Sequence, residues 1–170
     1  GARSPVPGRL RAGGAPEVIS GAPLGARWPQ VLPRSRAVLF TAGGTRVGAG
    51  PLRVDVLSLA DGKITTLVSG GSYGRYLASG HLAWVDRRTL FVAPFDLDRL
   101  QLSGPGVAVI NDISLNMYNS AEFDASQTGT FVCRCWPGGD DSVVQWLDPS
   151  GIATPLLPEP AEYSQLRLSP

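Results

Sequence analysis

The sequence predicts an all-β fold built from short antiparallel strands, and three observations support this prediction. No window of the 170 residues keeps apolar residues at helical spacing for three turns without a Gly or Pro interrupting it. The 21 glycines and 15 prolines require many turns, which favours short strands over long helices. Short apolar segments bounded by turn residues recur along the chain. A composition of 43% hydrophobic and 17% charged residues is typical of a globular protein.

The apolar segments have the length of β-strands. Asp61-Gly62 stands between two of them and is a strong hairpin signal, because Gly adopts a positive φ at no steric cost. The expected strands cover residues 37–40, 54–59, 64–68, 81–85, 89–93, 130–136 and 143–147.

Four similar segments, which we call the anchors, recur at a nearly constant spacing. They are centred on Pro33, Ala78, Gln127 and Pro170, which are 45, 49 and 43 residues apart, and an apolar or aromatic residue precedes each. An apolar strand follows each complete anchor, and a hairpin follows later in each unit. The hairpins are expected near residues 61–62, 98–104 and 148–151.

A period in the forties, filled by about four short strands and no helix, is the spacing of β-propeller blades. We therefore expect a partial β-propeller of about three four-stranded antiparallel blades, with incomplete blades at both ends. Such a segment would belong to a longer chain, and its open sheet edges would make the isolated 170 residues aggregate or oligomerise. The expected blades cover residues 26–72, 73–118 and 119–160, with residues 9–25 ending a preceding blade and residues 161–170 starting the next.

Five stretches around the anchors and hairpins resemble a known family of repeats. They are residues 28–33, 76–82, 94–100, 146–151 and 168–170. Together they resemble the TolB-like, WD-repeat-like propeller repeats of bacteria. The anchor of that family usually reads Ser-Pro-Asp-Gly, whereas this chain has Leu-Pro-Arg-Ser and Ser-Gln-Thr-Gly in two of the corresponding places.

The resemblance implies a binding or sensing module, because such arrays often form the extracytoplasmic half of bacterial transmembrane Ser/Thr kinases. Our first hypothesis is a non-catalytic segment that binds a protein or peptide, in an extracytoplasmic or periplasmic location, with a cytoplasmic one left open. The alternative is the gating propeller of a prolyl-oligopeptidase-like serine hydrolase whose catalytic domain lies elsewhere. The segment has no kinase motif, and Lys63 is its only lysine. We expect no catalytic residue, cofactor or metal within it.

The stretch from Gly70 to Gly74 fits the G-x-S-x-G pattern of a hydrolase nucleophile elbow, with Ser72 in the place of the nucleophile. An elbow needs a strand-to-helix turn, followed later in the chain by an acid and then a histidine. Here a helix-breaking segment follows, and the sole histidine, His81, comes nine residues later without a preceding acid. We expect Ser72 to lie in a loop between blades.

Other groups with metal-binding or redox chemistry have simpler interpretations. Cys133 and Cys135 stand at i and i+2 of a strand, on one face with Phe131 and roughly 6.6 Å apart, and their parallel Cβ directions argue against a disulfide. With one histidine in the chain, a zinc site would need carboxylates, so we expect buried structural thiols. The acidic pairs at 96–98 and 140–141 lack the spacing of a calcium loop and are expected in solvated turns.

The charge and the apolar residues bear on which partners and locations the sequence indicates. The net charge is +1 with scattered basic residues, which does not indicate nucleic-acid binding, and the preference for Arg over Lys points to a bacterial source. No apolar run approaches the roughly 20 residues of a membrane span. Trp28, Trp84 and Trp146 are expected to pack between sheets, with Trp136 before an exposed loop.

Overall fold

The computed structural model describes residues 23, 25–44, 50–116, 118, 120–135, 143–148, 152–157, 159, 161 and 168. These residues form β-strands, turns and one short 3-10 helix, η1 (Pro33–Ser35). Within them no helix is long and apolar enough to cross a membrane. Apart from residues 23 and 25, the expected end of a preceding blade at 9–25 lies outside the described residues, as do the loop after Trp136 and the acidic pair at 140–141.

The strands form three antiparallel sheets in chain order. The first sheet contains β1 (Arg27–Val31), β2 (Ala37–Ala42), β3 (Arg53–Ser58) and β4 (Ile64–Ser69). The second contains β5 (Ser72–Leu77), β6 (His81–Asp86), β7 (Thr89–Asp96), β8 (Gln101–Leu102) and β9 (Val107–Ile110). The third contains β10 (Phe123–Ala125), β11 (Phe131–Cys135), β12 (Val143–Leu147) and β13 (Ala153–Pro155).

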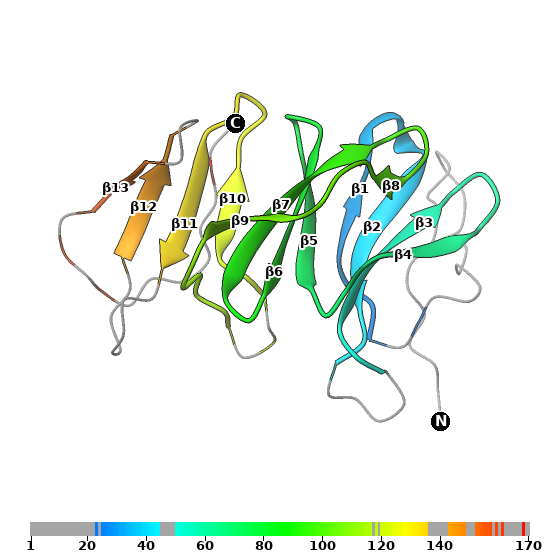
Figure 1. Cartoon of the computed structure of the whole chain (residues 1–170), viewed down its shortest axis with the longest axis horizontal. Coiled ribbons are helices and arrows are strands. Elements are labelled where there is room, and N and C mark those ends of the chain that lie inside the picture. The colour runs from blue at the N-terminus through cyan, green and yellow to red at the C-terminus, as the bar shows by residue number, and fades with distance from the viewer. Residues whose placement is uncertain are drawn as a thin grey trace, which may run out of the picture.

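Each sheet is a meander in which every strand pairs with the next one along the chain, except that β8 and β9 both pair with β7. β9 pairs with the start of β7 and β8 with its end, so the two short strands together occupy the fourth position of that sheet. The three sheets stand side by side like blades (Figure 1). The predicted class, a partial all-β propeller, is confirmed.

The two larger core clusters lie on either side of the second sheet, and a smaller one, with Phe40, Ala42 and Leu57, belongs to the first sheet. β6 sends Leu82 and Trp84 into a cluster shared with the first sheet, and Ala83 and Val85 into a cluster shared with the third. Both faces of β6 are therefore buried, which explains why its sequence is a continuous apolar run and not an alternating one. Trp84 packs between the sheets, as predicted.

Glycines make room for the large side chains of this core. A Cβ at Gly71 would lie 2.6 Å from Trp84 Cδ1, and a Cβ at Gly106 would lie 2.5 Å from Trp84 Cη2. A Cβ at Gly74 would lie 2.3 Å from Val54 Cγ1. The close approach of β5 to the first sheet therefore depends on a residue without a side chain.

The seven apolar strands expected from the sequence appear as β2, β3, β4, β6, β7, β11 and β12. The expectation that Ser72 lies in a loop between blades is wrong, because Ser72 is the first residue of β5 and pairs with Val85. Only Gly70 and Gly71 join the first sheet to the second, and the positive φ of Gly70, 88°, lets the chain turn within that short connection.

Candidate binding site between the first strands of the sheets

The first strands of the three sheets, β1, β5 and β10, lie next to one another. Trp28, Tyr73 and Phe123, one from each strand, form a row of edge-to-face rings with centroid separations of 5.5 Å and 5.3 Å. The guanidinium of Arg75 lies over the Tyr73 ring, 4.2 Å from its centroid. Aromatic contacts of this kind hold adjacent blades together beyond their buried area.

A side chain of β1 joins the first sheet to the second through the backbone of Tyr76. Gln30 Nε2 donates a hydrogen bond to the Tyr76 carbonyl at 3.1 Å, and the Tyr76 N–H donates to Gln30 Oε1 at 2.7 Å. Gln30 stands three residues before its anchor, and Tyr76 stands two residues before the next anchor. The glutamine amide thus pairs with backbone groups that face away from β6.

A related contact joins the third sheet to the residues that follow it. Asp124, three residues before its anchor, accepts a hydrogen bond at Oδ2 from the N–H of Leu168, two residues before the next anchor, at 3.0 Å. The partners are 46 residues apart in the first contact and 44 in the second. The same position of the repeat therefore supplies an acceptor to the backbone of the following unit.

Arg75 holds this position in the second sheet and behaves differently. A guanidinium has no hydrogen-bond acceptor, so it cannot receive the N–H of the next unit. Its Nη1 instead donates to the carbonyl of Trp28 at 2.8 Å and to that of Gly74 at 3.3 Å. The N–H of Ala125 donates to Oδ1 of the neighbouring Asp124 at 3.0 Å.

A hollow of ≈ 70 Å³ opens where this contact between sheets is missing. Arg75 and Asp124 place opposite charges at its wall, and both side chains are half-buried. Residues at the end of β5 and in the turn after β10 complete it. The lining residues are Gln30, Arg75, Tyr76, Leu77, Ala78, Phe123, Asp124, Ala125, Ser126 and Gln127.

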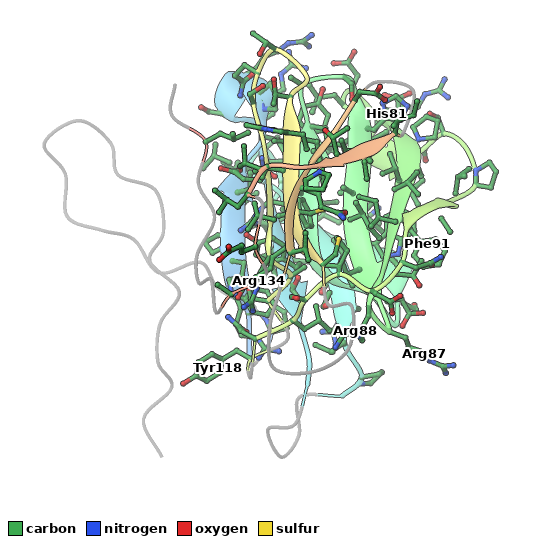
Figure 2. All side chains as sticks on the ribbon, turned by 90° about the vertical axis from the view of Figure 1, so that its left-hand side faces the viewer. His81, Arg87, Arg88, Phe91, Tyr118 and Arg134 are labelled. Carbon is green, nitrogen blue, oxygen red and sulfur yellow. The ribbon has the colours of Figure 1, made fainter. Side chains whose placement is uncertain are left out.

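The hollow lies at one end of the sheets. Ala78, which lines it, belongs to the turn between β5 and β6, and His81 follows that turn. Figure 2 places His81 at one end of the molecule and Arg87, Arg88 and Tyr118 at the opposite end. The turn with Arg87 and Arg88 is therefore remote from the hollow.

Ser72 and His81 do not form a catalytic pair. Ser72 pairs with Val85 and His81 pairs with Leu77, so the two residues lie at opposite ends of the β5–β6 hairpin. Ser72 is 4% exposed, and its Oγ donates to the Val85 carbonyl at 3.4 Å. The Nδ1 of His81 lies 3.1 Å from the Ser79 Oγ. The chain continues from Ser72 in a strand and not in the helix of a nucleophile elbow.

The described residues contain no group of three His, Cys, Asp or Glu that could hold a metal ion. Asp96 is the last residue of β7 and not part of a turn as expected, and its Oδ1 accepts the N–H groups of Asp98 and Arg99 in the turn that follows. Asp98 forms exposed ion pairs with Arg34 and Arg36. Cys133 and Cys135 are free thiols on the same face as Phe131, as predicted.

Comparison with known proteins supports the fold. No family model matches the chain, and no curated protein matches it. The structure is similar to that of regucalcin, a calcium-binding protein from Agrobacterium tumefaciens and a β-propeller, with a TM-score of 0.53 and 17% sequence identity. The similarity covers 76% of this chain and 43% of that one, so the chain spans less than half of the regucalcin structure.

Gln30, Arg75 and Asp124 were not predicted as site residues. The signal was present, because all three stand three residues before an anchor and all three are polar. Aligning the anchors would have shown an amide, a guanidinium and a carboxylate at one repeated position. That these side chains approach the neighbouring sheet follows only from the packing of β1, β5 and β10.

Proposed function

We propose that the chain is a non-catalytic propeller segment that binds a protein or peptide at the hollow between β5 and β10. The observation that carries the proposal is the pair of opposite charges, Arg75 and Asp124, at a concave site where the contact between neighbouring sheets is absent. A carboxylate of the ligand would bind beside Arg75, and a cationic group beside Asp124. Both would gain charge-assisted hydrogen bonds.

The size of the hollow favours a peptide over a metabolite. Pockets that enclose a whole small molecule have roughly 300–1,000 Å³, whereas this hollow has ≈ 70 Å³. That volume accepts one side chain or a chain terminus while the rest of a ligand lies across the surface. We further propose that this peptide-binding segment is part of a larger bacterial protein, such as a receptor-type Ser/Thr kinase with an extracytoplasmic propeller. The resemblance of the repeats supports that context.

An array of short peptides with free and blocked termini tests the proposal on the full-length protein. Peptides that bind should lose affinity roughly tenfold to hundredfold in Arg75→Gln, because one charge-assisted hydrogen bond contributes about 1.5–3 kcal/mol. Arg87→Gln is the matched control, since Arg87 is exposed at the opposite end of the molecule (Figure 2). Equal affinities for wild type and Arg75→Gln, or no bound peptide at all, would contradict the proposal.

A further inference from the structure

The end of β11 carries two thiols in contact. Cys133 Sγ and Cys135 Sγ are 3.3 Å apart. Both side chains pack against the core cluster between the second and third sheets, and Cys133 is 1% exposed, whereas Cys135 is only partly buried. Arg134, between them, has its Nε 2.7 Å from Glu122 Oε2. The alternation of a strand thus puts the thiols together on one face.

The separation fits disulfide chemistry better than a zinc site. Two sulfurs bound tetrahedrally to zinc at ~2.3 Å would lie about 3.8 Å apart, farther than the two thiols are now. Zinc would also need two more ligands, and in the part of the chain that the structure describes no third His, Cys, Asp or Glu joins the pair. Among the described residues, each thiol therefore has the other as its nearest reaction partner.

The two cysteines have different environments. When Cys135 is ionised, the Cys133 S–H donates a hydrogen bond to it, and this lowers the pKa of Cys135 despite burial and the nearby charge of Asp112. The same hydrogen bond and the deeper burial raise the pKa of Cys133. Cys135, which is also the more exposed of the two thiols, is therefore better suited to act as the nucleophile, with Cys133 held beside it.

We propose that Cys133 and Cys135 are a peroxide-reactive dithiol that closes to an intrastrand disulfide. The Cys135 thiolate attacks one oxygen of hydrogen peroxide, the O–O bond breaks, and Cys135 becomes a sulfenic acid as hydroxide leaves and takes up a proton. The Cys133 sulfur then attacks the Cys135 sulfur, the S–O bond breaks, and the hydroxyl leaves as water with the Cys133 proton. In total, two thiols and one peroxide give one disulfide and two waters.

Closing the disulfide requires a local change in β11. Residues i and i+2 of a strand have Cα atoms roughly 6.6 Å apart, close to the upper limit of about 6.8 Å for a disulfide. Cys135 is the last residue of β11, and it pairs with Val143 on one side and bridges to Ile113 on the other. Contraction at this end would loosen those pairings while the start of β11 stays in its ladder.

Mass spectrometry of the reduced, folded protein tests this proposal. The protein is treated with one equivalent of hydrogen peroxide, unfolded, alkylated with iodoacetamide and digested with chymotrypsin, which leaves both cysteines on one peptide. We expect that peptide to be two hydrogen atoms lighter and unalkylated, and dithiothreitol should restore two alkylated cysteines. Full alkylation after peroxide treatment, or disulfides only between separate chains, would overturn the proposal.

Single variants test the separate roles. In Cys133→Ala, Cys135 should stop at the sulfenic acid and be trapped by dimedone. In Cys135→Ala, Cys133 should remain fully alkylated after the same treatment. Loss of the Cys133 thiol in that variant at the wild-type rate would show that the roles are assigned wrongly. The mass of the wild-type peptide shows whether the disulfide forms, so the main test does not depend on the folding of a variant.

Discussion

Gly74→Ala should destabilise the protein by inserting a methyl group between the first two sheets. A Cβ at position 74 would lie 2.3 Å from Cγ1, 3.2 Å from Cγ2 and 3.3 Å from Cβ of Val54. Carbon atoms prefer separations of about 3.5–4.0 Å, so the nearest pair must separate by more than about 1 Å. Val54 is fully buried, which leaves it little room to move.

The expected loss in the free energy of unfolding is about 1–3 kcal/mol, the usual cost of an extra methyl group in a packed core. For a domain of this size that loss lowers Tm by about 2–4 °C per kcal/mol. Calorimetry of both proteins at one pH measures the shift. Gly104→Ala is the matched control, since its Cβ would meet only Pro94, at 3.3 Å, and both variants reduce the entropy of the unfolded chain alike.

Truncating Val54 shows whether the clash is the cause. Val54→Ala removes the two γ-carbons and costs about 2 kcal/mol by itself. Combined with Gly74→Ala, it should cost less than the sum of the single changes by about 1 kcal/mol or more, because the new methyl group fills the space that the valine left. The reasoning is refuted if the two losses add, or if Gly74→Ala and Gly104→Ala melt at the same temperature.

Two further predictions concern polar contacts of the first and third sheets. Gln30→Leu leaves the N–H and the carbonyl of Tyr76 without their partner, and should lower the free energy of unfolding by about 1–3 kcal/mol in urea titration. Gln127→Leu in an exposed turn should change it little, and equal midpoints for the two variants would contradict the role of Gln30. Burial, which outweighs the attraction of Arg134, raises the pKa of Glu122 above 4.5. Its contribution to stability is therefore present below pH 4.5 and is lost as pH rises through the folded-state pKa. A glutamine at position 122 does not titrate, so the stability of Glu122→Gln relative to wild type should increase as the pH rises from below 4.5 through the folded-state pKa of Glu122. A constant difference would count against the assignment.

Most strands that the sequence predicted have buried apolar residues, whereas β4 was predicted from the Asp61-Gly62 hairpin before it and is largely exposed. β2 and β6 are nearly continuous apolar segments because they lie inside their sheets and pack on neighbours, and β3 and β11 each interrupt such a segment with one charged residue, Asp55 or Arg134. The first strands were not predicted, since β5 reads Ser-Tyr-Gly-Arg-Tyr-Leu and combines a glycine with polar residues. The register shifts in β5 near Tyr73, which has a φ of 52°. Packing against the first sheet, not intrinsic propensity, holds this strand.

The site was less predictable than the fold, for a related reason. The i and i+2 spacing alone placed the two cysteines on one face, but the contact between their sulfurs depends on side-chain conformations that spacing does not set. Likewise, the polar residues before the anchors are visible in the sequence. Their partners are backbone groups of another sheet, and no sequence pattern marks a backbone carbonyl as available.

A single position of the repeat accounts for both the contacts between sheets and the hollow. Gln30 and Asp124 carry acceptors and receive an N–H group from the following unit, whereas Arg75 carries only donors and turns back to the carbonyl of Trp28. A glutamine in place of Arg75 supplies the acceptor that arginine lacks, so it can form the contact seen at Gln30. Arg75→Gln should thus weaken ligand binding with a smaller loss of stability than Gln30→Leu, because the new contact offsets the lost contacts with Trp28 and Tyr73. That contrast distinguishes a residue whose main role is to bind the ligand from one whose main role is to stabilise the fold.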